Sequence, residues 1–266
     1  MLGEYLKDRR GKLDPAAFGF SMTRRRTPGL RREEVAQRAN VSATWYTWLE
    51  QGRGGTPSAE VLDRLAYALT LTEVEREHLF LLAQQRPPQV QYREAERITP
   101  QLQRVLDALE YSPALVRTAA WDVIAWNRAA VAVLGDYSAL APHERNVLRL
   151  MFTDPHAKTR LLDWEHEARN AVAGFRADTV RAGASERVAA LVDELSRSSA
   201  DFAKLWREHD VRTYVSGAKR MRHATGVTID FEYSSFAVDG RPDLSLVIFT
   251  PATGDDSQRV RDLLRH

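Results

Sequence analysis

The residues with the most specific chemistry lie in one short segment, 32–53 (REEVAQRANVSATWYTWLEQGR). Threonine side chains can hydrogen-bond base edges or phosphates, and their methyl groups can contact the C5 methyl of thymine. At helical spacing, one face of the second half of this segment carries such groups. We predict that this face reads DNA in the major groove through Ser42, Ala43, Thr44, Thr47 and Trp48.

Basic side chains flank the predicted reading face. Arginine contacts to phosphate set affinity and register rather than the choice of sequence. Residues 1–53 carry eleven Lys/Arg and six Asp/Glu, a balance of +5, whereas the whole chain has a net charge of only +2. A basic N-terminal segment followed by a mildly acidic remainder is typical of a protein with an N-terminal DNA-binding domain. We predict that the phosphate contacts come from Arg24, Arg25, Arg26, Arg32 and Arg53.

Two short helices, about 31–39 and 43–51, are needed to position these groups. Ser42 has the side chain of a helix N-cap, and Gly52 stands where a glycine commonly ends a helix. In a helix-turn-helix the contact between the helices requires small and apolar residues at fixed offsets. Those residues are Val35, Ala36, Ala39, Val41, Tyr46 and Leu49, and Trp45 could serve either packing or DNA.

Further helices are expected near 2–10, from 57 and from the capping box at 72–75. The prolines and polar residues that follow indicate a linker. We therefore assign residues 1–84 to a DNA-binding domain, 85–97 to the linker and 98–266 to a second domain.

The second domain has mixed α+β character. A hairpin is expected across Trp121-Asp122, and Asn127 could cap a short helix reaching Leu134. Residues 142–207 are mostly helical, and apolar residues then alternate from 211 onward, with a turn at Asp239-Gly240 and a last helix at 255–264.

The stretches TRRRTPGLRREEVAQRANVSATWYTWLEQGR (23–53) and PSAEVLDRLAYAL (57–69) resemble the lambda-repressor-like helix-turn-helix of the XRE family, and more narrowly the MmyB-like regulators. The resemblance continues at WDVIAWNRAA (121–130), ERNVLRLMF (144–152) and SGAKRMRH (216–223). It implies an α+β protein of two domains. An all-α lambda-repressor-like domain would be followed by a PAS-like α+β domain that binds an effector.

A PAS-like cup would be lined by apolar and aromatic side chains with a few convergent polar groups. An arginine among apolar walls would suit a carboxylate. We predict effector contacts from Trp126, Arg145, Phe152, Trp164, Trp206, Arg212 and Phe231, with Trp121, Asn146, Leu150, Phe175, Phe202, His209, Lys219 and Phe249 as further candidates. For any one of these aromatic residues, an ordinary position in the core is the favoured interpretation.

The 266-residue chain has no cysteine, which excludes disulfides, thiolate zinc sites and a cysteine nucleophile. It also lacks an HExxH motif, a phosphate-binding P-loop and a G-x-S-x-G elbow, so we expect no enzyme, no cofactor and no metal. Uncharged stretches are too short to span a membrane and the first residues are polar, so we expect a cytoplasmic protein.

Together these features predict a sequence-specific transcriptional regulator that binds a double-stranded DNA operator as a homodimer. A small effector would control it, and the resemblance makes an apolar or fatty-acid-like molecule conceivable. A DNA-tethered enzyme and a protein-interaction adaptor are the alternatives. The identity of the effector, the operator and the sign of regulation stay open.

Overall fold

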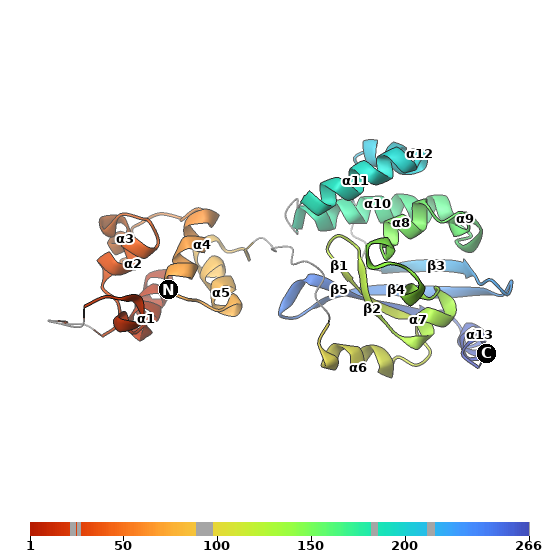
Figure 1. Cartoon of the computed structure of the whole chain (residues 1–266), viewed down its shortest axis with the longest axis horizontal. Helices are drawn as coiled ribbons and strands as arrows, with labels where there is room; N and C mark the ends of the chain where they lie inside the picture. Colours follow the sequence, from red (N-terminus) through yellow and green to blue (C-terminus); the bar gives the residue numbers. More distant parts are fainter. Residues whose placement is uncertain (22–24, 26–27, 89–97, 182–185, 212–215, 266) are drawn as a thin grey trace. The chain divides into compact units, whose positions relative to one another are not determined.

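The computed structural model describes residues 1–21, 25, 28–88, 98–181, 186–211 and 216–265. The chain divides into two compact units, Met1–Pro88 and Gln89–His266 (Figure 1).

The first unit is helical throughout its described elements. These are α1 (Leu2–Lys12), the 3-10 helix η1 (Pro15–Phe18), α2 (Arg32–Arg38), α3 (Ala43–Glu50), α4 (Ala59–Ala68) and α5 (Glu73–Gln84). The Ser42 hydroxyl accepts a hydrogen bond from the Trp45 amide at 3.1 Å, which makes Ser42 the N-cap of α3. Gly52 follows α3 with φ +74°, the left-handed conformation that favours glycine after a helix. The predicted capping box at Thr72 and Glu75 is confirmed.

The core of the first unit lies between α2, α3 and the helices around them. Val35, Ala39 and Tyr46 are fully buried, and Ala36 and Leu49 are nearly so, as the helix-turn-helix pattern predicts. Val41 and Trp45 are partly buried and pack against this core. Trp45 therefore serves helix packing. The helix-turn-helix is held by apolar contact on one side, which leaves the opposite side of α3 outside the core.

The second unit is built on an antiparallel sheet. Its strands are β1 (Ala114–Thr118), β2 (Val123–Trp126), β3 (Ser216–Arg222), β4 (Thr228–Val238) and β5 (Arg241–Pro251). Their order across the sheet is β2-β1-β5-β4-β3 (Figure 1). The turn at Asp239-Gly240 connects the two longest strands, β4 and β5, as the sequence predicts. The predicted α+β architecture, an all-α unit followed by a PAS-like sheet-and-helix unit, is confirmed.

Helices cover the two faces of this sheet unequally. They are α6 (Pro100–Ala108), α7 (Arg128–Val133), α8 (Val147–Phe152), α9 (Ala157–Arg160), α10 (Trp164–Arg181), α11 (Glu186–Ser198), α12 (Ala200–Arg207) and α13 (Gly254–Leu263), with 3-10 turns at Tyr137–Ala139 (η2) and Pro142–Glu144 (η3). Figure 1 shows α8 to α12 over one face and α6 on the other, and Val260 of α13 belongs to the larger core. Strand alternation separates the faces: Leu115 and Val247 join the larger core, while Ala114 and Val116 pack with Leu106 of α6.

One buried side chain joins the elements around β1. Asn127 is 3% exposed, and its Oδ1 accepts hydrogen bonds from the amides of Ala114 and Ala130 at 3.0 and 2.9 Å. Its Nδ2 donates to the carbonyls of Leu106, Leu109 and Ser112. Asn127 therefore caps α7, as predicted, and also holds the end of α6 beside β1.

Candidate functional site

The outward side of α3 is the first candidate site. Thr44 is exposed, and Trp48 is 49% exposed. Ala43 and Thr47 are partly exposed, and the Thr47 hydroxyl donates to the Ala43 carbonyl at 2.8 Å. Thr44, Thr47 and Trp48 thus lie on the side of α3 away from the core, and Ala43, which packs partly against the core, lies at the edge of that side. We call these four residues the α3 reading face. Ser42 is exposed at its start.

A buried ion-pair cluster fixes the end of α3. The Glu50 side chain is 1% exposed, and its carboxylate accepts from Arg10 Nε at 2.6 Å and from Arg32 Nε at 2.7 Å. Arg10 also donates to the Leu30 carbonyl at 2.6 Å. Burial alone would raise the pKa of the Glu50 carboxyl, but hydrogen bonds and charges from Arg10 and Arg32 outweigh burial and hold that pKa below its usual range. One carboxylate therefore joins α1, α2 and α3.

The closest approach of α1 to α3 requires a glycine. A Cβ built on Gly3 would overlap the backbone carbonyl of Glu50. Because a backbone atom cannot swing aside, the two helices can approach this closely only if residue 3 has no side chain. Gly3 and the ion-pair cluster thus position the same end of α3.

The predicted phosphate contacts have different surroundings. Arg32 is 39% exposed while it is paired with Glu50, and Arg53 is exposed just after α3. Arg25 departs from the prediction, because its side chain is only 9% exposed and forms two hydrogen bonds to Glu34, at 2.7 and 3.0 Å. It donates further to the carbonyls of Ser21 and Gly29. Arg25 is therefore a contact within the unit rather than an open clamp. Arg24 and Arg26 lie outside the described residues.

The second candidate site is a cavity of about 290 Å³ in the second unit. It lies between the sheet and the helices that cover it. Leu115, Val247 and Phe249 line it from the sheet, Val147, Leu150 and Met151 from α8, and Ala157 and Leu161 from α9 and its end. Its volume is close to the lower end of the range for small-molecule sites, which is roughly 300–1,000 Å³.

Three cationic side chains enter this mostly apolar lining. They are Arg117 of β1, Arg160 of α9 and Lys219 of β3, and Asp136 and Asp154 are the carboxylates that line the cavity with them. The formal charge of the lining is therefore +1. A cavity with apolar walls and convergent charges of this sign can bind an amphipathic molecule through both of its parts.

Each of the two cations that the sheet contributes is buried beside a carboxylate from α10. Lys219 Nζ lies 3.3 Å from Glu167 Oε2, an ion pair without hydrogen-bond geometry to that oxygen, and both side chains are less than 10% exposed. Arg117 is 3% exposed, and one of its terminal nitrogens lies 3.4 Å from Asp178. The guanidinium also lies 3.6 Å from the centre of the Trp121 ring. α10 thus supplies the counter-charges behind the sheet side of the cavity.

A buried hydroxyl completes the polar lining. Burial raises the pKa of Tyr137 to about 12, against a smaller opposite effect of Arg160. The Tyr137 phenol is therefore neutral at physiological pH. It can donate or accept a hydrogen bond without adding charge to the cavity.

The seven predicted effector contacts do not form this lining. Trp126, Arg145, Phe152, Trp164, Trp206 and Phe231 are all absent from it, and Arg212 lies outside the described residues. Among the further candidates, Leu150, Lys219 and Phe249 do line the cavity. Effector contacts from these seven residues remain a prediction, and the aromatic residues among them pack in the core instead of lining this cavity.

The large aromatic side chains pack against one another within the core. The Phe152 ring lies 5.6 Å from that of Trp164 and 5.2 Å from that of Phe202, which in turn stacks on Trp206 at 5.8 Å. Phe231 is fully buried opposite Lys219 in the sheet. Aromatic type and helical spacing indicate burial, but they do not distinguish a core from the wall of a cavity.

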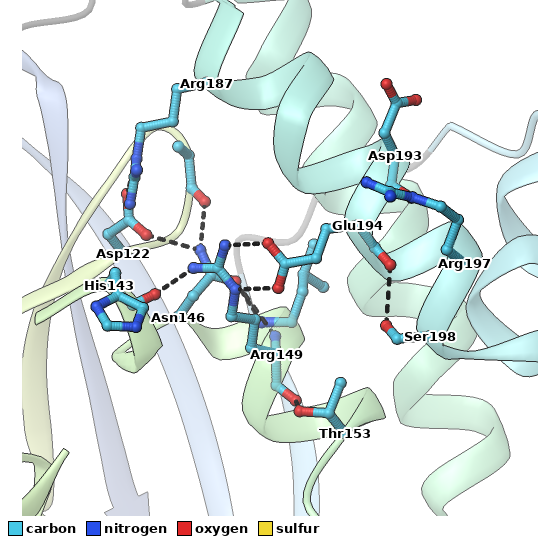
Figure 2. Close-up of polar contacts among 12 residues, drawn as sticks. Asp122, His143, Asn146, Arg149, Thr153, Arg187, Asp193, Glu194, Arg197 and Ser198 are labelled. Carbon is cyan, nitrogen blue, oxygen red and sulfur yellow. Dashed lines mark hydrogen bonds and ion pairs between the residues drawn. The ribbon is translucent and has the colours of Figure 1, made fainter. Parts of the chain in front are cut away.

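The predicted polar candidates Arg145 and Asn146 have structural contacts. Arg145 lies over the Trp126 ring and donates to the Leu140 carbonyl at 3.0 Å. Asn146 is fully buried; its Nδ2 donates to the Ala120 carbonyl at 2.8 Å and to Asp122 at 3.0 Å, and its Oδ1 accepts from the Leu148 amide (Figure 2). His209 is exposed.

The same close-up shows how α8 is fastened. Arg149 donates to both oxygens of Glu194 on α11, and Arg187 of α11 pairs with Asp122 at 2.8 Å (Figure 2). Arg149 also donates to the His143 carbonyl. Since α8 supplies Val147, Leu150 and Met151 to the cavity, these polar contacts hold one wall of the cavity against α11.

Sequence reasoning missed Arg117, Tyr137 and Arg160. A usable signal existed for Arg117, because it is the one charged residue in the apolar strand 114–118 and shares the sheet face of Leu115. No comparable pattern marked Tyr137 or Arg160, which reach the cavity from a 3-10 turn and a four-residue helix.

The first unit thus has the geometry of a helix-turn-helix, and the second combines a PAS-like sheet with a cavity beside it. Together these features define a class of DNA-binding regulators with a ligand-binding domain. Residues 98–264 match the MmyB-like transcription regulator ligand binding domain, and residues 1–79 match a helix-turn-helix domain. The chain belongs to the MmyB-like transcription regulator ligand binding domain family, and it is a DNA-binding transcriptional regulator. No curated protein matches the chain. Among the described residues, no helix is long and apolar enough to cross a membrane.

Proposed function

We propose that the chain binds its operator as a homodimer and that a small effector in the cavity of the second unit controls this binding. The observation that supports effector control is the cavity itself, which combines apolar walls with Arg117, Arg160 and Lys219. The effector would be an amphipathic molecule with an anionic group, and a fatty-acid-like molecule fits this description.

In the DNA complex, α3 would lie in the major groove with its N-terminal residues toward the bases. Ser42, Ala43, Thr44, Thr47 and Trp48 would face the bases. Arg32 and Arg53 would contact phosphates, as would Arg24 and Arg26, which remain a prediction from the sequence. A two-fold dimer would place two copies of α3 on half-sites about one helical turn apart.

Native mass spectrometry of the purified full-length chain, before and after denaturation, tests the proposal most directly. We expect a dimer and a co-purified small molecule that is lost on denaturation. Titration of laurate into delipidated protein then measures whether an anionic amphipath is bound, and a footprint on a selected operator measures its effect on DNA binding.

A matched pair of lysine variants tests the role of the cavity. Lys219→Met keeps an unbranched chain but removes the charge that faces the cavity, so we expect laurate affinity to fall at least tenfold. Lys204→Met makes the same change at an exposed position of α12 and should leave the affinity unchanged. If laurate binds equally to both variants, the anionic group is not recognised by Lys219. If laurate binds to wild type without altering the footprint at any concentration, effector control by this class of molecule is wrong.

A further inference from the structure

The α3 reading face has an unusual chemical property: it carries no charge. The one charged residue of α3 is Glu50, which is buried and paired with Arg10 and Arg32. The groups left facing outward are the side chains of Thr44 and Thr47 and the indole of Trp48, with Ala43 partly buried at the edge of the face.

Hydrogen-bonding capacity on this face is also small. The Thr47 hydroxyl already donates to the Ala43 carbonyl, and the Ser42 hydroxyl already accepts from the Trp45 amide. Gln51 carries an exposed amide, but it is the C-cap of α3 and follows the four residues of the reading face. Ser42 keeps its donor and Thr47 its acceptor sites, so with Thr44 they offer base edges single hydroxyl contacts, which can be made to more than one kind of base.

The major-groove code shows what such a face can and cannot read. Guanine is commonly read by arginine or lysine, adenine by asparagine or glutamine, and cytosine by aspartate or glutamate. The reading face has none of these side chains. Thymine alone presents an apolar group, its C5 methyl, which alanine, threonine and aromatic side chains contact favourably. A guanine edge presents no apolar group to the face of the indole, which offers it a single N–H donor.

We propose that α3 selects its half-site by apolar contact with thymine methyl groups, with Trp48 as the largest contact surface. The preferred half-site then has thymines under α3 and is not specified there by guanine. This inference rests on the proposed placement of α3 in the major groove. It assigns the arginines outside α3 to affinity and the uncharged face to sequence choice, because phosphate contacts are the same at every sequence.

The test removes a methyl group and nothing else. Full-length protein selects its site from a random duplex library, and each thymine of the selected half-site is then replaced in turn by deoxyuridine. Deoxyuridine pairs with adenine as thymine does but lacks the C5 methyl. Each contacted methyl should weaken binding about fourfold, the effect of removing one buried methyl from an apolar contact.

A double-mutant cycle identifies the protein side of the contact. At the thymine that Trp48 covers, Trp48→Ala should weaken binding to the thymine site and abolish the further loss caused by deoxyuridine. Tyr67→Ala is the matched control, because Tyr67 is a 77% exposed aromatic residue on α4, outside the reading face. It should leave the deoxyuridine effect intact. Thr44→Ala provides a second variant at an exposed position.

The outcomes distinguish the reading of thymine methyl groups from sequence-specific DNA binding itself. Selected sites that lose affinity on methyl removal, with the loss dependent on Trp48, support methyl reading. A selected half-site that tolerates deoxyuridine at every thymine overturns methyl reading while leaving major-groove binding intact. Failure to enrich any sequence overturns both methyl reading and the proposed sequence-specific function.

Discussion

The buried carboxylate of Glu50 is the contact on which the position of α3 depends most, and Glu50→Gln tests it. The substitution preserves shape but removes the charge that Arg10 and Arg32 share. Each pair is worth about 4 kcal/mol of attraction at an effective dielectric constant of ~20, before the cost of desolvation. Arg10 would stay buried, at 8% side-chain exposure, with the Leu30 carbonyl as a remaining hydrogen-bond acceptor.

Removing one partner of a buried pair typically destabilises a protein by roughly 3–5 kcal/mol. We expect Glu50→Gln to lower the free energy of unfolding of the first unit by about 3 kcal/mol, since Arg32 is 39% exposed and can regain water. Urea unfolding followed by circular dichroism measures this change. Glu60→Gln is the matched control, because Glu60 pairs with Arg64 at 2.6 Å with its side chain 81% exposed. Its effect should stay within about 0.5 kcal/mol.

The pH dependence adds a second readout. The pKa of Glu50 is lower in the folded than in the unfolded state, so its stabilisation is present above the ordinary carboxyl pKa of about 4.3 and is lost as the pH falls through the folded value. The stability difference between wild type and Glu50→Gln should therefore narrow in acid. A difference below about 1 kcal/mol at neutral pH, or one that grows in acid, would refute the role assigned to this carboxylate.

Two further predictions concern close packing and buried hydrogen bonds. Gly3→Ala should destabilise the first unit by about 1–3 kcal/mol in thermal unfolding, because the new methyl overlaps the Glu50 carbonyl, whereas Gly11→Ala in the same helix meets no atom within 4 Å and should be neutral or stabilising. Asn127→Asp would turn a carboxylate toward three carbonyl oxygens, so we expect a loss of more than ~3 kcal/mol by urea unfolding; Asn40→Asp, at an exposed position, should cost less than about 1 kcal/mol.

The elements of the first unit were largely predictable because local chemistry determines them. Ser42 and Thr72 begin α3 and α5 as capping residues, and Gly52 has the positive φ that its position after α3 requires. In the second unit, the hairpin turn and the cap at Asn127 were predictable for the same reason. The order of the strands was not, because it depends on contacts between residues far apart in the chain.

The cavity was the least predictable feature, and the strand alternation explains why. Lys219 and Phe231 are paired neighbours on one sheet face, yet Lys219 lines the cavity while Phe231 lies in the packed core. Which of two neighbours borders empty space depends on the helix above each, and that packing is not encoded in the period of either strand. Residue type predicted the burial of Phe231 but not that it would lie outside the lining of this cavity.

The arginines near α3 show that residue type alone does not distinguish an arginine held in an ion pair from one that can contact phosphate. The sequence presents them as one basic cluster, but Arg10 and Arg25 are committed to Glu50 and Glu34, and Arg32 divides its surface between Glu50 and solvent. Part of the positive charge of residues 1–53 therefore holds the helices together and cannot reach phosphate without breaking an ion pair. An arginine such as Arg53, exposed beside α3, carries no such cost. In the proposed DNA complex, affinity and the stability of the fold would therefore depend on different arginines, and the uncharged face of α3 would select the sequence.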